Sequence, residues 1–258
     1  MRRRRYTGAV LYAALPVALV LLWWGLSALK LTNPYLVPSP QKTFAAAAGL
    51  VRSGELFRHL LVSLGRVWAG FGLSVCAALP LALAFHLCGA ARKIFHGVFE
   101  LLRAIPPLAM IPLLILWFGI GEASKLALIV LATFFPVFLS ALGGFDGMDG
   151  RWRELADSLE LPFSRRLRRV LIPAALPQII TGLRLGFGYA WRALLGAELF
   201  SSSAGLGYLI SDAGEMARVD TVYVGILLIG GLGLFFDTAL RIFTRRFTTA
   251  GEDRAWGA

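Results

Sequence analysis

The most informative segment of the chain is residues 145–184, FDGMDGRWRELADSLELPFSRRLRRVLIPAALPQIITGLR. It is the longest run of polar and charged residues in the chain, and long apolar segments lie on both sides of it. Apolar residues at helical spacing predict a short amphipathic helix over 152–161 and a basic one over 163–171, with Pro162 in the break between them. An apolar stripe on a segment facing water needs a covering surface, which favours a docking element over a loop that only sets topology.

The composition indicates a polytopic helical membrane protein. The chain has 258 residues, of which 57% are hydrophobic and only 16% charged, and this balance excludes an ordinary soluble domain. The formal net charge of +11 comes largely from arginines that cluster between apolar segments, as the positive-inside rule describes. No nucleic-acid-binding motif accompanies this charge, so we expect no nucleic acid partner.

Six apolar segments predict an all-α fold with about six transmembrane helices. The predicted spans are 9–29, 61–87, 98–118, 126–142, 174–198 and 221–240. This topology puts the basic clusters on one side of the membrane, which predicts cytoplasmic N- and C-termini. A cleaved signal peptide is the competing interpretation of the first segment, but its length and the lack of a small-residue cleavage site favour a span.

The same pattern divides the chain into three parts. Residues 1–60 hold the first span and an outer segment with a short surface helix, and residues 61–245 form the transmembrane domain with a cytoplasmic loop at 145–175. Residues 246–258 are expected to form a cytoplasmic tail. Residues 89–97 are expected to form a short cytoplasmic loop before the third span.

Prolines and charges in the third span mark a candidate translocation pathway. Arg103 is followed by Pro106 and Pro107, which should kink or break the helix. The freed backbone groups need protein or a water-lined cavity, although a kink that only shapes packing remains open. In the second span, Arg66 is expected to snorkel to the outer surface.

The fifth span is the most polar, and helical spacing allows Arg184, Arg192 and Glu198 to share one stripe. A charge at membrane depth is costly, so such residues face a cavity or a partner. The three are therefore candidate pathway residues, while ion pairs that lock helices remain the alternative. Glu198 would repel anions unless it is paired, so we expect it to be structural or to face a binding protein.

No motif for catalysis or for a cofactor is present. The chain lacks a Gly-x-x-x-x-Gly-Lys phosphate loop and a His-Glu-x-x-His metal motif, and its three histidines lack metal-ligand spacing. Cys76 and Cys88 are too far apart on one helix to form a disulfide. We expect no catalytic residue, no metal and no cofactor in this chain, so energy for transport must come from another subunit.

The central stretch resembles the cytoplasmic signature loop of bacterial ABC importer permeases, whose pattern is Glu-Ala-Ala, three residues, Gly, nine residues and Ile-x-Leu-Pro. Here Glu154-Leu155-Ala156 is followed by three residues, Glu160, nine residues and Val170-Leu171-Ile172-Pro173. The spacing matches at every step. The main departure is Glu160 in place of glycine, which bears on the turn geometry and the partner contact because glycine adopts left-handed backbone at low cost.

The resemblance covers roughly residues 60–245, and the flanking LIPAALPQIITGLR and AELFSSSAGLGYLI favour the branch that imports taurine, alkanesulfonates and nitrate. It implies that the loop docks on an ATP-hydrolysing subunit. The residues that it assigns to coupling are Glu154, Ala156, Leu159, Glu160, Pro162, Val170, Ile172 and Pro173.

The resemblance also implies the partners: two ATPase subunits that use ATP, a second permease copy, a substrate-binding protein, and the lipid bilayer of a bacterial inner membrane. The expected substrate is a small anion, which arginines in the spans would suit. A permease for a thiamine-precursor pyrimidine or another organic solute remains open. From other classes, a non-transporting membrane scaffold and a membrane-embedded enzyme remain as alternatives.

Overall fold

The computed structural model describes the backbone of residues 2–244, and the side chains in this range except those of 2–13, 152, 153, 155 and 201. Helix is the regular secondary structure throughout the described range, which confirms the all-α prediction. The predicted tail, 246–258, lies outside the described residues.

Three long helices form the centre of the bundle. Helix α6 (Glu122–Asp146) packs against both α3 (Glu55–Leu87) and α9 (Ile172–Ser201). Gly182 and Gly186 on α9 leave no room for a side chain, since a Cβ would overlap Ser140 or Val137 of α6. The close approach of these two helices therefore depends on small residues, as expected for packing in lipid.

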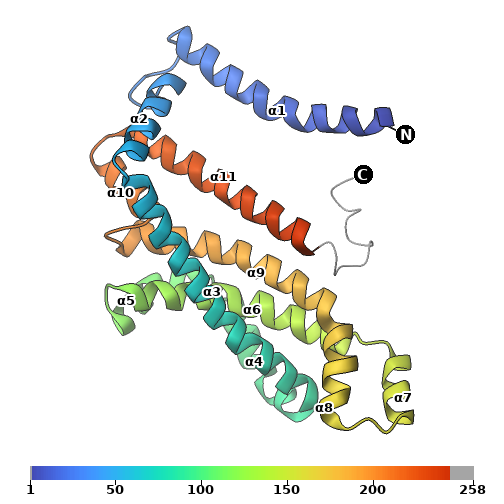
Figure 1. Cartoon of the computed structure of the whole chain (residues 1–258). Coiled ribbons are helices and arrows are strands. Elements are labelled where there is room, and N and C mark those ends of the chain that lie inside the picture. Colours follow the sequence, from blue (N-terminus) through green and yellow to red (C-terminus); the bar gives the residue numbers. More distant parts are fainter. Residues whose placement is uncertain (1, 245–258) are drawn as a thin grey trace.

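Helix α11 (Val219–Thr244) runs beside α9, and the short helix α10 (Leu206–Glu215) lies between them in the chain (Figure 1). Helix α1 (Arg2–Ala28) stands apart from the bundle in Figure 1 and leads to the surface helix α2 (Pro40–Arg52). The ring centroid of Trp23 on α1 lies 5.8 Å from that of Tyr223 on α11, which links the first helix to the bundle.

The third predicted span is broken in two. Helix α4 (Gly89–Ala104) and the segment formed by the 3-10 turn η1 (Pro107–Met110) and α5 (Ile111–Phe118) are bent by 87° relative to each other. The bend confirms the break predicted from Pro106 and Pro107. The predicted loop at 89–97 is wrong, because these residues form the first turns of the amphipathic helix α4.

Four helical segments are long and apolar enough to cross a membrane: α3, α6, α11 and residues 163–200. The bent pair counts as a fifth if it is one span. The first predicted span lies in α1, where the apolar part with described side chains, Ala14–Ala28, is shorter than a full span. The structure thus supports a multi-pass membrane protein with four or five of the six predicted spans.

A helical hairpin projects from one end of the bundle (Figure 1). It consists of α7 (Gly150–Ser158), α8 (Phe163–Arg166) and the π-helical turn η2 (Leu167–Leu171), which continues into α9. We call residues 150–171 the α7–α8 hairpin and its side of the bundle the hairpin end. The other side, with α2 and α10, is the α10 end.

Candidate functional site

The α7–α8 hairpin presents apolar side chains to the surface. Leu159 and Phe163 are 60% and 59% exposed, although both are large and hydrophobic. Ala156 is buried at 2% exposure, so it faces the interior of the hairpin rather than a partner. An ion pair of 2.6 Å between Arg166 Nη1 and Asp157 Oδ1 joins the two short helices. The hairpin is therefore an ordered element with an uncovered apolar tip.

The turn after α7 has the geometry that a glycine would adopt. Glu160 has a φ of 46°, in the left-handed region. Its N–H donates to the carbonyl of Asp157 at 3.0 Å, and the N–H of Leu161 donates to the carbonyl of Ala156 at 3.2 Å. These two bonds form a Schellman C-cap, in which the left-handed residue is most often glycine. The turn is therefore preserved with Glu160 in place of glycine, at the conformational cost of a non-glycine residue in the left-handed region.

Replacing Glu160 with glycine is expected to stabilise the hairpin by about 0.5–1 kcal/mol, because glycine removes the left-handed strain but adds unfolded-state entropy. The melting temperature of the purified chain should rise by about 1–3 °C. Glu154→Gly, placed inside α7, is the matched control and should lower stability by about 1 kcal/mol. A fall of the melting temperature in both variants would contradict the turn assignment.

The other predicted coupling residues lie on the hairpin and in the first turn of α9, which follows it. Glu154 is exposed on α7, and Pro162 is exposed in the extended link before α8. Val170 is half-buried in the π-helical turn, and Ile172 and Pro173 are exposed in the first turn of α9. The sequence spacing did not predict the π-helical turn, a feature that is frequent at functional sites.

A cavity of about 440 Å³ lies at the base of the hairpin. Its lining joins Phe163, Arg166 and Leu171 of the hairpin to His86 of α3 and Asp146 of α6. His86 Nδ1 lies 2.8 Å from Asp146 Oδ1, and Arg92 on α4 forms an ion pair with the same carboxylate. The ends of α3, α4 and α6 therefore meet at Asp146 beside the hairpin.

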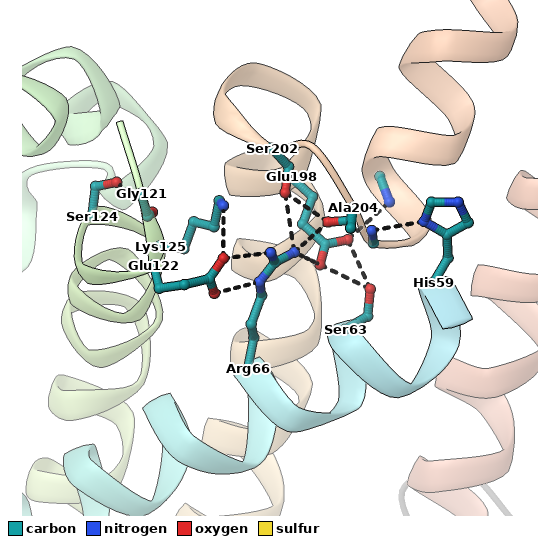
Figure 2. Close-up of polar contacts among 12 residues, drawn as sticks. His59, Ser63, Arg66, Gly121, Glu122, Ser124, Lys125, Glu198, Ser202 and Ala204 are labelled. Atoms are coloured by element: carbon teal, nitrogen blue, oxygen red, sulfur yellow. Dashed lines mark hydrogen bonds and ion pairs between the residues drawn. The ribbon is translucent and has the colours of Figure 1, made fainter. Parts of the chain in front are cut away.

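At the α10 end, Arg66 is the centre of a polar cluster (Figure 2). Its Nε and Nη2 donate to the two carboxylate oxygens of Glu122 at 2.7 and 2.6 Å, and its Nη1 donates to Glu198 Oε1 at 2.8 Å. The prediction that Arg66 snorkels is wrong, because the side chain is 7% exposed and turned inward. Arg66 thus ties α3 to α6 and α9.

The loop between α9 and α10 closes around the carboxylate of Glu198, which is 1% exposed. Ser63 donates to both of its oxygens at 2.8 and 2.9 Å, and the N–H of Gly207 donates to Oε2 at 2.9 Å. Gly205 has a φ of 126°, and a Cβ there would collide with this carboxylate. Of the roles expected for Glu198, this placement favours the structural one.

A second cavity, of about 170 Å³, lies between α9 and α11. Its lining includes Arg184, Trp191 and Arg192 on α9 and Asp237 on α11. Arg184 Nε and Nη2 both donate to Asp237 Oδ1 at 3.0 Å, so this predicted pathway residue is ion-paired. Asp237 was not among the predicted pathway residues, although a lone carboxylate in an apolar span is a visible signal.

Arg192 differs from the other span arginines. Its side chain is exposed on the described chain, and its guanidinium lies 5.8 Å from the centre of the Tyr189 ring, with no carboxylate partner among the described residues. Arg103 lies on α4, is exposed, and pairs with Glu100 at 2.6 Å. The structure brings Arg184 and Arg192 to one cavity, while no described polar contact joins Arg103 to either.

The comparisons with known proteins identify the family. Residues 70–249 match the sequence profile described as "Binding-protein-dependent transport system inner membrane component". The chain belongs to this family. It is 38% identical to the taurine transport system permease protein TauC of Escherichia coli, covering 89% of this chain and 86% of that one. It is 35% identical to the putative aliphatic sulfonates transport permease protein SsuC of Bacillus subtilis, covering 95% and 88%.

Chains in solved structures of ABC transporters share the fold. The chain is similar to one in the inward-facing MetNI methionine ABC transporter, with a TM-score of 0.67, 14% identity, and coverage of 77% of this chain and 98% of that one. An amino acid ABC transporter gives a TM-score of 0.64 at 17% identity, covering 78% and 97%. The member of the family described here is thus a permease component, which works with a separate ATPase and a binding protein.

Proposed function

We propose that the chain is the permease subunit of an ATP-driven importer of small organosulfonates in a bacterial inner membrane. The named activities of its relatives, taurine and aliphatic sulfonate transport, support the substrate class. The observation that carries the permease role is the α7–α8 hairpin, which keeps the family spacing, the left-handed turn and an exposed apolar tip. We further propose a homodimer of permeases with two ATPase subunits.

In this proposal the hairpin is the contact with the ATPase. Leu159 and Phe163 would insert into an apolar groove of that subunit, and the basic residues around them would lie at its rim. Because Asp146 joins the ends of three helices beside the hairpin, a movement of α7 would reach α3, α4 and α6 together. ATP shifts the permease between states only if the ATPase binds one of them more tightly.

The orientation follows from the basic residues. The hairpin end carries Arg165, Arg168 and Arg169, so the positive-inside rule puts it in the cytoplasm. The α10 end would then face the binding protein, and the Arg66 cluster would hold the helices in register on that side. Arg184 and Glu198, both ion-paired, would have structural roles.

The transport test uses the purified permease with its ATPase and binding protein in proteoliposomes. ATP-dependent uptake of taurine or ethanesulfonate is the expected result. Uptake of a pyrimidine or of nitrate, but of no sulfonate, would contradict the substrate class. A permease that binds no ATPase and supports no ATP hydrolysis would favour the scaffold alternative.

Replacing Arg192 with alanine is expected to lower sulfonate uptake at least tenfold while the transporter still assembles. The reason is that an unpaired guanidinium in a span gives an anion a charge-assisted partner, and a loss of about 1.4 kcal/mol corresponds to a factor of ten. Uptake rate and the yield of assembled complex are measured together. Arg192→Lys, which keeps the charge, should retain part of the uptake; loss of assembly in the alanine variant would assign Arg192 to packing instead.

A further inference from the structure

We propose that the cavity between α9 and α11 binds a short zwitterion, with a sulfonate on Arg192 and an ammonium group on Asp237. The proposal rests on the proposed function and narrows its substrate class to aminosulfonates.

Arg192 provides the anion-binding end. The nearby Arg184 is neutralised by Asp237, and Arg66 by Glu122 and Glu198, whereas the described residues offer Arg192 the Tyr189 ring and no carboxylate. Arg192 lies nine residues before Ser201, the last residue of α9, which is about 13 Å along the helix axis. An unpaired cation at such depth is costly in lipid, so this side of α9 needs water or an anion. A sulfonate offers three oxygens to the planar guanidinium fork.

Asp237 provides the cation-binding end. Its Oδ1 accepts two hydrogen bonds from Arg184, but its Oδ2 accepts a single bond of 3.2 Å. The side chain is 49% exposed, and a carboxylate offers about four acceptor sites, so one acceptor site on Oδ2 is left for a ligand. Arg184 thus fixes the orientation of the carboxylate without saturating it.

The wall and size of the cavity set the length of the ligand. Phe187, Trp191 and Phe236 line it, and Trp191 Nε1 donates to the carbonyl of Ile229 at 3.3 Å, which fixes the indole. A volume of about 170 Å³ corresponds to roughly six waters at about 30 Å³ each. This volume suits a linker of two or three carbons between the charged groups rather than a long alkyl chain.

These features predict discrimination between two sulfonates that share a two-carbon chain. Taurine would satisfy both Arg192 and Asp237. Ethanesulfonate carries the same sulfonate but ends in a methyl group where taurine has its ammonium, so it offers Asp237 no charge-assisted hydrogen bond in addition to those from Arg184.

The test measures uptake of labelled taurine and ethanesulfonate by the complete transporter in proteoliposomes, with the binding protein saturated by each solute. Asp237→Asn is expected to lower taurine uptake at least tenfold and to change ethanesulfonate uptake less than twofold. Arg192→Gln is expected to lower both at least tenfold. Glu100→Gln is the matched control, since it removes a carboxylate that also pairs with an arginine, Arg103, on another helix; it should leave both rates unchanged.

An unchanged ratio of taurine to ethanesulfonate uptake in Asp237→Asn overturns the proposal. If this variant assembles poorly, the double variant Arg184→Gln/Asp237→Asn removes both charges of the pair. An unchanged ratio of taurine to ethanesulfonate uptake in this double variant then overturns the proposal. A wild-type transporter that imports neither sulfonate overturns the proposed function itself, and the site with it. Wild-type uptake of sulfonates together with an unchanged ratio in Asp237→Asn would overturn the zwitterion site alone.

Discussion

Replacing Arg66 with alanine is expected to destabilise the chain by about 3–5 kcal/mol, because it removes one partner of a buried ion pair. The guanidinium contacts Glu122, Glu198, Ser202 and the carbonyl of Ala204, and the side chain of Glu198 has no solvent exposure of its own. Without Arg66, the carboxylate of Glu198 would stay buried with no opposite charge. The melting temperature in detergent should therefore fall by about 10 °C.

Two control variants test whether the loss of stability in Arg66→Ala comes from the buried ion pair rather than from the removal of an arginine in general. Arg103→Ala removes an arginine whose ion pair with Glu100 is of similar length but half exposed, and it should cost less than about 1 kcal/mol. The double variant Arg66→Met/Glu198→Leu removes both buried charges, so it should recover most of the loss. Equal melting temperatures for Arg66→Ala and Arg103→Ala would show that the cluster contributes no special stability.

Local features of the chain were predictable from the sequence. The apolar runs located the long helices within a few residues, since a span needs about 20 apolar residues whatever it packs against. Pro162 marked the break inside the α7–α8 hairpin, and Pro106 with Pro107 marked the break between α4 and α5. Each of these signals is contained in a short stretch and acts through backbone geometry.

The ion pairs were not predictable, because their partners are far apart in the sequence. Arg66 and Glu198 are 132 residues apart, and Arg184 and Asp237 are 53 apart. Single charges in apolar spans are visible, but which of them meet depends on the rotation of each helix in the bundle. Residues 89–97 were mistaken for a loop because their charges lie on one side of an amphipathic helix.

The sequence also could not decide how Glu160 takes the place of a glycine. Two outcomes were compatible with the substitution: a different turn, or the same turn at a conformational cost. The C-cap hydrogen bonds from Glu160 and Leu161 enforce the second, because they satisfy carbonyls at the end of α7. The loop therefore keeps its shape, so a defect in Glu160 variants would arise from stability rather than from a different contact surface.

Replacing Leu159 with aspartate is expected to abolish binding of the ATPase subunit while the permease remains folded and inserted. Leu159 is exposed in the described chain, so a charge there costs the isolated permease little. In the complex, the same charge would enter an apolar contact, and loss of a central apolar anchor costs about 2 kcal/mol or more. This corresponds to at least a thirtyfold weaker association by the relation of about 1.4 kcal/mol per factor of ten.

The position of the substitution is essential to this experiment. Ala156 also belongs to the signature loop, but it is buried, so a charge there would unfold α7 and leave docking untested. Leu36→Asp is the matched control, because Leu36 is similarly exposed, at 69%, in the segment before α2. Co-purification of the ATPase, ATP hydrolysis and uptake should be normal in this control and lost in Leu159→Asp.

The same substitution at Phe163 tests whether α8 also contributes to the contact with the ATPase. If Leu159 and Phe163 form one contact surface, Phe163→Asp should weaken ATPase binding to a similar extent, and the double variant should add little because the contact is already lost. Normal ATPase binding and uptake in Leu159→Asp would remove the hairpin tip from the interface. Coupling would then have to run through the exposed face that Ile172 and Pro173 form at the start of α9, and the same assay on charged substitutions there would reveal it.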